Sequence, residues 1–133
     1  MKVKDFVNIK GEERVEVIVA VPFMDMVNIC VCNDIKKFAE KELKDLNASD
    51  QLIKDIIPED PGYGLSIEIN DEGIHIMMVL VELEADISTL VHETVHITHY
   101  ILEPRGLSHN SFTDELYAYY QQWFFAEFLR KMS

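Results

Sequence analysis

The first third of the chain alternates apolar and polar positions in the way that β-strands require. Residues 15–21 are apolar and mostly β-branched, and after Pro22 the apolar positions of 27–32 recur at every second residue. Because side chains two positions apart point to one face of a strand, both segments are predicted strands. Cys30 and Cys32 share one face of the second strand, where they are expected to be small buried side chains.

A helical period follows these two strands. Apolar side chains at positions 35, 38, 39 and 43 recur at helical spacing, and Asn33 or Asp34 precedes them as a candidate cap. This helix is expected to end near residue 47. Residues 48–64 then contain two prolines and two glycines, which predicts a long, irregular and mobile loop.

Alternation returns over residues 65–81. Apolar side chains at 65, 67 and 69 alternate with polar ones, which predicts a strand with one solvated face. Residues 70–73 have the composition of a turn, and residues 74–81 are almost entirely apolar, as in a strand that is covered on both faces. The two strands are therefore expected to form a hairpin.

Two helices are predicted for the last third of the chain. Asp86 can cap a helix that runs to about Leu102. Ser111 and Asp114 have the spacing of a capping box, so a final, largely buried aromatic helix is expected over residues 112–130. The element order β-β-α-β-β-α-α predicts an α+β fold, with a sheet of about four strands packed on the last two helices.

Length, charge and cysteine content narrow the classes of function. A chain of 133 residues predicts a single domain over 1–133. The 24 acidic and 12 basic residues give a net charge of −12, which argues against binding nucleic acid or an anionic membrane surface. The N-terminus shows no apolar signal segment, and the longest nearly apolar stretch, 17–24, is too short to span a bilayer. The two cysteines lack the spacing of a redox or zinc motif, so a reducing, cytoplasmic location is predicted.

Candidate chemistry lies in the first of the two last helices. Residues 92–96 read His-Glu-Thr-Val-His, the pattern H-E-x-x-H. Histidines four positions apart lie on one face of a helix, so His92 and His96 can bind one zinc ion. Glu93 can then take a proton from water that such an ion activates. The alternative is that all three are ordinary side chains on a helix surface.

A helical wheel places the two histidines at the edge of an apolar face. This face is expected to contain Ile87, Leu90, Val91, Val95, Ile101 and Leu102. His92, His96 and His99 form a stripe along its edge. A catalytic zinc site usually has a third protein ligand and an open position. Leu102 stands where the extended H-E-x-x-H-x-x-G-x-x-H pattern has its third histidine, so that subclass is excluded.

The third ligand is expected from the final helix. Glu115 lies in its first turn, at the boundary of the buried side, and Ala118 one turn on is small enough to let two helices approach. A carboxylate there needs a compensating charge, which a metal supplies. Asp114 is the main rival, and a capping acid favoured by the helix dipole is the alternative.

These features together resemble a known family. H-E-x-x-H with a glutamate nineteen positions after the second histidine resembles the gluzincin metallopeptidases. The compact length and the segment 114–123, Asp-Glu-Leu-Tyr-Ala-Tyr-Tyr-Gln-Gln-Trp, are similar more narrowly to small phage-encoded zincin-like proteins, the minigluzincins. The resemblance covers about residues 65–130. It implies that His92, His96 and Glu115 bind zinc, that Glu93 is the general base, and that the protein acts in a host cytoplasm. The lobe that usually lies beneath the cleft is absent here.

Lesser roles are expected for the remaining polar side chains. His99 either orients a ligand or is a surface histidine, and His109 either donates to a transition state or is a loop residue. Tyr119 can hydrogen-bond an oxyanion, although core packing is the preferred interpretation. Gln121 interrupts an apolar face and is expected to be hydrogen-bonded in the interior. Four methionines are expected to fill the core, namely Met24, Met26, Met77 and Met78.

The sequence thus predicts a small zinc-dependent metallopeptidase that hydrolyses peptide bonds in a peptide or protein substrate. An edge strand of the sheet would hold the extended substrate. The rival hypothesis is an acidic binding or inhibitor protein whose zinc site is closed by a fourth ligand, such as His99, and is inert. Metal-dependent hydrolysis of another kind of bond is a third. The aromatic final helix is also a candidate surface for homo-oligomers.

Overall fold

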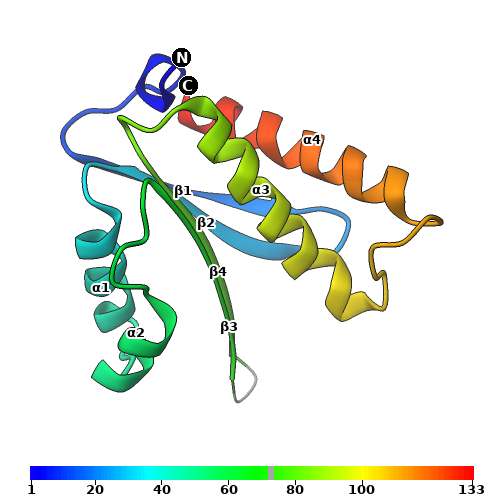
Figure 1. The fold of residues 1–133 in the computed structure, drawn as a ribbon, viewed down its shortest axis with the longest axis horizontal. Coiled ribbons are helices and arrows are strands. Elements are labelled where there is room, and N and C mark those ends of the chain that lie inside the picture. The colour runs from blue at the N-terminus through cyan, green and yellow to red at the C-terminus, as the bar shows by residue number, and fades with distance from the viewer. Residues whose placement is uncertain (72–73) are drawn as a thin grey trace.

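The fold is built on a four-stranded mixed sheet (Figure 1). The computed structural model describes residues 1–71 and 74–133, and its strands are β1 (Glu13–Ala20), β2 (Asp25–Cys32), β3 (Gly64–Asp71) and β4 (Ile74–Glu82). Their spatial order is β1-β2-β4-β3. Strands β1 and β2 pair antiparallel, as do β3 and β4, and β2 pairs in parallel with β4 at the centre. The predicted strands and the second hairpin are confirmed, while the turn predicted at 70–73 includes positions outside the described residues.

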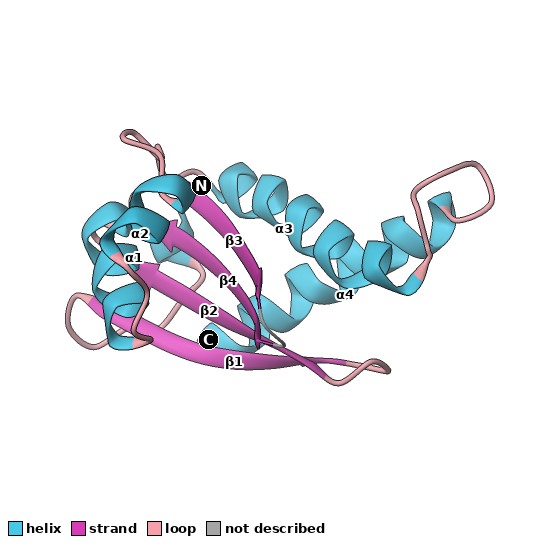
Figure 2. Cartoon of the chain, turned by 90° about the horizontal axis from the view of Figure 1, so that it is seen from below, coloured by secondary structure: helices cyan, strands magenta, loops and turns pink. Residues whose placement is uncertain are grey.

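Helices cover both faces of the sheet. Helices α1 (Ile35–Asp45) and α2 (Asp50–Ile56) lie on one face, and α3 (Ile87–Leu102) and α4 (Asp114–Met132) lie on the other (Figures 1 and 2). Short 3-10 helices occur at Val3–Asp5 and Glu103–Arg105. The α+β class is therefore confirmed in its coarse form, as a four-stranded mixed sheet with four α-helices in the described chain.

Alternate side chains of the two central strands enter two separate cores. Val27 and Val79 belong to the core under α3 and α4, whereas Cys30 and Leu80 belong to the core under α1 and α2. Residues 77–81 of β4 are all buried, so the prediction of a strand covered on both faces is confirmed there. Both cysteines are buried on one face, as expected. One face of the sheet thus packs on α3 and α4, and the opposite face packs on α1 and α2.

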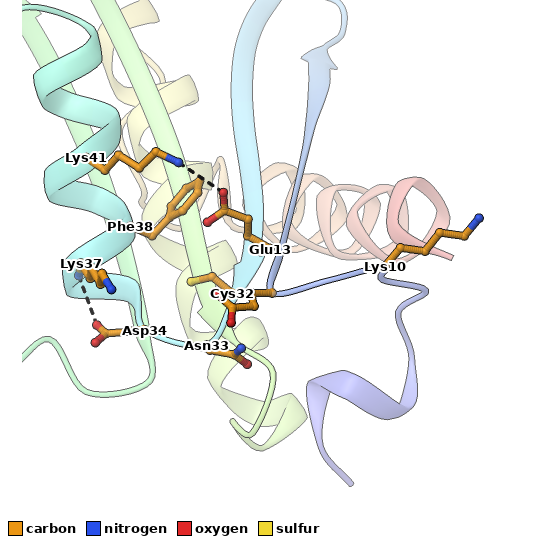
Figure 3. A pocket seen from close by; sticks show the side chains of 9 residues that line it. Lys10, Glu13, Cys32, Asn33, Asp34, Lys37, Phe38 and Lys41 are labelled. Carbon is orange, nitrogen blue, oxygen red and sulfur yellow. Dashed lines mark hydrogen bonds and ion pairs between the residues drawn. The ribbon is translucent and has the colours of Figure 1, made fainter.

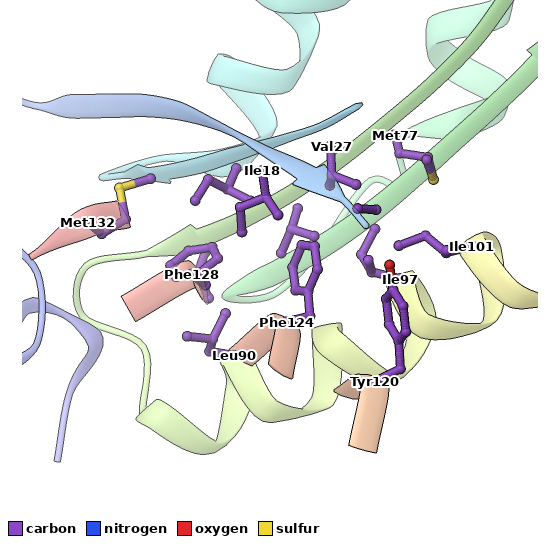
Figure 4. Packing of buried hydrophobic residues seen from close by; sticks show 14 of the residues in the cluster. Ile18, Val27, Met77, Leu90, Ile97, Ile101, Tyr120, Phe124, Phe128 and Met132 are labelled. Carbon is purple, nitrogen blue, oxygen red and sulfur yellow. The ribbon is translucent and has the colours of Figure 1, made fainter. Parts of the chain in front are cut away.

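Aromatic side chains of α4 fill the larger core (Figure 4). Phe124 and Phe128 are fully buried and point toward the sheet, where Ile18 lies. Burying each such side chain contributes about 1.5–3 kcal/mol, which fixes α4 against the sheet. Helix α3 lies beside α4 and adds Leu90 and Ile97 to the same core. The helix that carries the H-E-x-x-H pattern is therefore rigidly supported on one side.

The predicted caps of α1 and α3 are confirmed, and the cap predicted for α4 is wrong. Asp34 accepts a hydrogen bond from the Lys37 backbone N–H over 3.1 Å, and Asp86 accepts one from the Ser88 N–H over 2.9 Å. At α4, however, the cap residue is Thr113, whose side chain accepts no capping bond. Asn110 Oδ1 instead accepts from the backbone N–H groups of residues 112 and 113 over 2.8 and 3.2 Å. This side-chain turn replaces the capping box expected from Ser111 and Asp114.

The irregular loop predicted at 48–64 is wrong in its first half. Residues 50–56 form α2, which begins at Ser49, where the side chain accepts from the Leu52 N–H over 3.1 Å. The helix buries Ile53 in the smaller core. The prolines and glycines that predicted a loop all lie after residue 57, so they end this helix and do not prevent it.

The four methionines divide evenly. Met77 and Met78 are buried, as expected, whereas Met24 and Met26 are each 65% exposed, so the prediction that they fill the core is wrong. Met24 lies in the turn between β1 and β2. Met26 lies near the start of β2, whereas α1 and α2 lie at the other end of that strand (Figure 2). Within the described part of the chain, no helix combines the length and apolar character needed to cross a membrane.

Candidate metal centre

Helix α3 buries a face that differs from the wheel prediction. Val91 and Val95 are 42% and 40% exposed, so their assignment to the buried face is wrong. Glu93, Thr94 and Thr98 are buried instead. The two threonine hydroxyls donate to backbone carbonyls within the helix, over 2.6 Å to residue 91 and 2.7 Å to residue 94. Since these bonds satisfy the hydroxyls, the threonines can face the core, and the helix is turned so that Glu93 faces the sheet.

The two histidines of the pattern meet on the solvent side of α3. His92 Nε2 and His96 Nε2 lie 3.3 Å apart, and the rings meet edge to face with centroids separated by 5.0 Å. Both side chains are exposed. With Glu93 they form a group whose ligand atoms all lie within 4.8 Å of one another. No other set of three histidine, cysteine or carboxylate side chains in the described chain is so closely grouped.

The separation of the two imidazole nitrogens fits a single metal ion. Zinc holds histidine nitrogens at about 2.0–2.1 Å in tetrahedral geometry, which places two of them about 3.4 Å apart. The observed separation of the two Nε2 atoms is 3.3 Å. In the absence of an ion, two neutral imidazoles at this distance share one proton donor at most. The geometry therefore matches a pair of nitrogens that both direct a lone pair at a common ion.

Glu93 lies on the buried side of this pair. Its side chain is only 4% exposed, and burial raises the pKa of its carboxyl, although His92 and the Ser66 hydroxyl partly oppose that shift. The Ser66 hydroxyl of β3 donates to the Glu93 backbone carbonyl over 3.2 Å, which ties the edge strand to the helix. A carboxyl with a raised pKa holds a proton more readily, so it is a stronger base than an exposed glutamate.

Gly64 allows β3 to lie against α3 at the site. A Cβ atom at this position would meet Thr89 Cγ2 at 2.7 Å and Glu93 Cγ at 3.0 Å. Any other residue would push the strand and helix apart or displace the Glu93 side chain. Beside Gly64 opens a cavity of about 460 Å³ that Glu93 helps to form; its lining is Pro61, Tyr63, Gly64, Ser88, Thr89, His92 and Glu93.

The surroundings of His96 favour its neutral form. Partial burial lowers the pKa of His96, and His92 and His99 add to this effect. The ring of Tyr100 stacks on His96 with centroids 6.4 Å apart. Neutral imidazole is the form that binds a metal ion, so the environment prepares this side chain for coordination.

Glu115 is not brought into the group. It is exposed, and its carboxylate is not among the ligand atoms that converge at His92, Glu93 and His96. Gln121 Nε2 donates to the Val91 carbonyl and to Thr94 Oγ1, each over 3.3 Å, which confirms the expected hydrogen bonding at a position that is half-buried and not interior. Ala118, one turn earlier in α4, lines a cavity together with Thr98. The next turn, with Asp114 and Glu115, therefore lies level with the end of α3.

A second group of ring side chains occupies that end of α3. His99 Nδ1 pairs with Glu103 Oε1 and His109 Nε2 pairs with Asp114 Oδ1, each over 2.8 Å. The Tyr117 ring packs on both imidazoles, with centroids 4.9 and 4.6 Å away, and the two imidazoles meet edge to face at 5.8 Å. His99, His109, Asp114 and Tyr117 form part of a cavity of about 160 Å³.

Tyr119 lies outside this second group. It is 66% exposed, so the preference for core packing is wrong. Its position on the solvent side of α4 follows from the buried Tyr117, Tyr120 and Phe124, which take up the side of the helix that meets the core.

Another cavity lies away from the histidines (Figure 3). It measures about 640 Å³ and lies beside α1. Three lysines and three acidic residues line it, and Lys41 Nζ pairs with Glu13 Oε1 over 3.4 Å. These charges balance one another, and no histidine is present. The cavity therefore lacks the ligand set found at α3.

Comparisons with known proteins add no relative. No protein-family model, curated protein sequence or solved structure matches this chain.

Proposed function

We propose that this protein is a zinc-dependent metallopeptidase in which His92 and His96 hold the metal and Glu93 is the general base. The observation that carries the proposal is the pair of Nε2 atoms 3.3 Å apart with a buried carboxylate beside them. The structure supports a metal-binding group in general terms, and the donor set of two imidazoles and a carboxylate favours zinc.

The residues of the chain divide the chemistry between them. A bound zinc ion supplies a Lewis acid, which lowers the pKa of water and polarises a carbonyl. Glu93 accepts a proton from the attacking water at its carboxylate and gives it to the amine that leaves. Burial raises the pKa of Glu93, which suits both transfers near neutral pH. His92 and His96 keep the reacting centre on the solvent side of α3, where a peptide has access.

The edge strand β3 supports binding of an extended peptide. It is the last strand of the sheet, and it pairs with β4 on one side only. Its first residue, Gly64, touches Glu93, so the free edge of the strand begins at the site. A peptide that adds to this edge would be held by backbone hydrogen bonds and would pass beside the two histidines.

The open character of the group also supports catalysis over a closed, inert site. The rival hypothesis requires a fourth protein ligand, and His99 is the donor that it would use. The His99 Nδ1 atom pairs with Glu103, and His99 is not part of the close group. An ion held by His92 and His96 would therefore keep positions free for water and substrate.

Glu115 remains our proposed third ligand, with Asp114 as its rival. Asp114 is already paired with His109, whereas Glu115 lies in the same first turn of α4 and is exposed. Zinc content of Glu115→Gln and Asp114→Asn distinguishes them. A weaker affinity in the first variant alone would support Glu115. Wild-type affinity in both would remove α4 from the ligand set.

The mechanism is tested by Glu93→Gln, assayed on an internally quenched peptide library with zinc added. We expect turnover to fall about 100- to 10,000-fold, because the general base is lost while the amide keeps the shape of the side chain. Zinc content, measured by elemental analysis, should stay at the wild-type level. Glu12→Gln, at an exposed residue away from α3, serves as a matched control that should keep most of the activity. Turnover that survives in Glu93→Gln would exclude Glu93 as the base.

A further inference from the structure

The net charge of the protein lies entirely on the part of the chain that forms the site. Residues 57–129 contain 13 of the 24 acidic residues and one of the 12 basic residues, a difference of −12. The rest of the chain therefore has 11 of each, and its net charge is zero. The single basic residue of the segment, Arg105, pairs with Asp25 over 2.7 Å. Asp25 at the start of β2 thus neutralises it, while Glu84 and Glu127 of the segment pair with Lys2, Lys4 and Arg130 from outside it.

Acidic side chains reach the site from several elements. Asp60 directly precedes Pro61, which lines the cavity beside Glu93. Glu68 of β3 lies near the Tyr100 ring, whose pKa rises chiefly through burial and further through Glu68 and Glu93. Glu103 lies at the opposite end, bonded to His99. Among the described residues, none of these carboxylates pairs with a lysine or arginine within 4.0 Å.

Glu93 provides independent evidence that this surface receives a ligand. Glu93 is only 4% exposed, and its carboxylate pairs with no lysine or arginine of the described chain; His92 and the Ser66 hydroxyl are the groups that favour its ionised form. It lines the cavity of about 460 Å³ that opens between β3 and α3. A buried carboxylate without a cationic partner is costly, and it is normally compensated by a metal, a proton or a ligand.

We propose that the substrate of this site is a cationic peptide segment, with lysine or arginine side chains on both sides of the bond that is hydrolysed. This rests on the proposed function, because it names the substrate class of the same site. Asp60 and Glu103 lie toward opposite ends of α3, and neither pairs with a lysine or arginine of the described chain, although Glu103 meets His99. Basic side chains on both sides of the centre would therefore meet a carboxylate. The excess of carboxylates near the site would also draw such peptides toward it and repel acidic ones.

The first experiment compares three internally quenched peptide libraries on the zinc-loaded protein. They are identical except that the positions flanking the random central residues are lysine, glutamine or glutamate. Each exposed charge contact changes binding by about 1.4- to 5-fold. With several contacts, we expect kcat/KM for the lysine library to exceed that for the glutamate library at least tenfold. The preference should weaken at high salt.

A triple variant localises the effect. Asp60→Asn, Glu68→Gln and Glu103→Gln together remove three charges near the site and keep the side-chain shapes. The matched control removes three charges from the neutral part of the chain, with Glu12→Gln, Glu40→Gln and Asp50→Asn. We expect the preference for lysine to fall at least threefold in the first variant and less than 1.5-fold in the control.

Binding to the zinc-loaded Glu93→Gln protein separates this inference from the proposed function. Its readout is the fluorescence anisotropy of labelled lysine-flanked and glutamate-flanked peptides, which needs no turnover. Tighter binding of the lysine peptide without hydrolysis by the wild type would support the cationic ligand and overturn the peptidase. Hydrolysis with equal or greater preference for glutamate would overturn the inference and leave the peptidase standing. Absence of both binding and hydrolysis would overturn the inference as well.

Discussion

Helix α3 carries two groups of histidines that differ in what their ring nitrogens meet. At the end of the helix, His99 and His109 each pair with a carboxylate over 2.8 Å. In the middle, His92 and His96 meet only each other, with their Nε2 atoms 3.3 Å apart. Among the described residues, one ring nitrogen of each histidine in the first group therefore meets a carboxylate, whereas the Nε2 atoms of the second group meet each other.

The number of converging ligand atoms explains why only one group is a candidate metal centre. His92, Glu93 and His96 bring three ligand atoms within 4.8 Å of one another, and no such set surrounds His99 and His109 in the described chain. A carboxylate on the second ring nitrogen is common for metal-bound histidines, so the pairing of His99 and His109 does not itself exclude a metal. The convergence of ligand atoms is therefore more informative than histidines at helical spacing alone.

Removal of single imidazoles should give the largest difference in zinc affinity between the two groups. We expect His92→Ala and His96→Ala each to weaken zinc binding more than about 100-fold, since loss of a ligand costs more than loss of a group that orients one. His99→Ala and His109→Ala should change zinc affinity less than about threefold. Competition with a chromophoric chelator measures all four constants. Equal losses of zinc affinity in His92→Ala and His99→Ala would show that both groups contribute to one metal site.

Gly64→Ala should disturb the middle group and spare the end group. The added methyl would lie 2.7 Å from Thr89 Cγ2, so β3 and α3 must separate, at a cost of about 1–3 kcal/mol in the free energy of unfolding. Urea denaturation measures this cost. The double variant with Thr89→Ser, which lacks the clashing methyl, should recover part of it. A Gly64→Ala protein as stable as the wild type would mean that the strand does not press on the helix.

Tyr117→Phe should weaken the end group alone. The Tyr117 hydroxyl donates to the Leu107 carbonyl, and the variant loses this bond while it keeps the ring between the two imidazoles. We expect a loss of about 1 kcal/mol in stability and no change in zinc affinity. Tyr119→Phe, at a side chain that is 66% exposed, is the control and should stay within about 0.5 kcal/mol.

The last prediction concerns how Glu93 changes the stability of the metal-free protein with pH. Burial raises the pKa of Glu93 in the folded protein above the ordinary value of 4.5. The folded state therefore binds this proton more tightly than the unfolded state, so the contribution to stability is complete below pH 4.5 and is lost as pH rises through the folded pKa. Without metal, Glu93→Gln should melt above the wild type at pH 7, and the difference should shrink below pH 4.5. A higher Tm for the wild type at pH 7 would contradict this.

The sequence predicted the elements of this fold better than their mutual placement. The caps at Asp34 and Asp86 and the strand covered on both faces follow from local patterns, and they are confirmed. The turn of α3 about its axis was not predictable from apolarity, because Thr94 and Thr98 become compatible with the core only through hydrogen bonds to their own helix. The register of α4 on α3 depends on Gln121 bridging two turns of α3, a contact that no local pattern encodes.

The same limit applies to the candidate site. The grouping of His92, Glu93 and His96 follows from spacing within one helix, so the sequence alone was sufficient for it. The part played by Gly64 was missed, because its importance arises from the approach of a strand that ends the sheet. A glycine at the start of a predicted strand, after a loop rich in proline, was the signal available in the sequence.

The parallel pairing of β2 with β4 has a consequence for how the molecule assembles. Val27 lies beside Met77, fifty positions away along the chain, whereas each hairpin joins neighbours in sequence. The two hairpins can form early and independently, but the seam between them must wait until a long loop closes, which slows folding. Helix α3 follows β4, and its Leu90 and Ile97 share one core with Ile29 and Val79, which face each other across that seam. Its histidines therefore reach their working surroundings only in the final stage, after most of the polypeptide has already acquired structure.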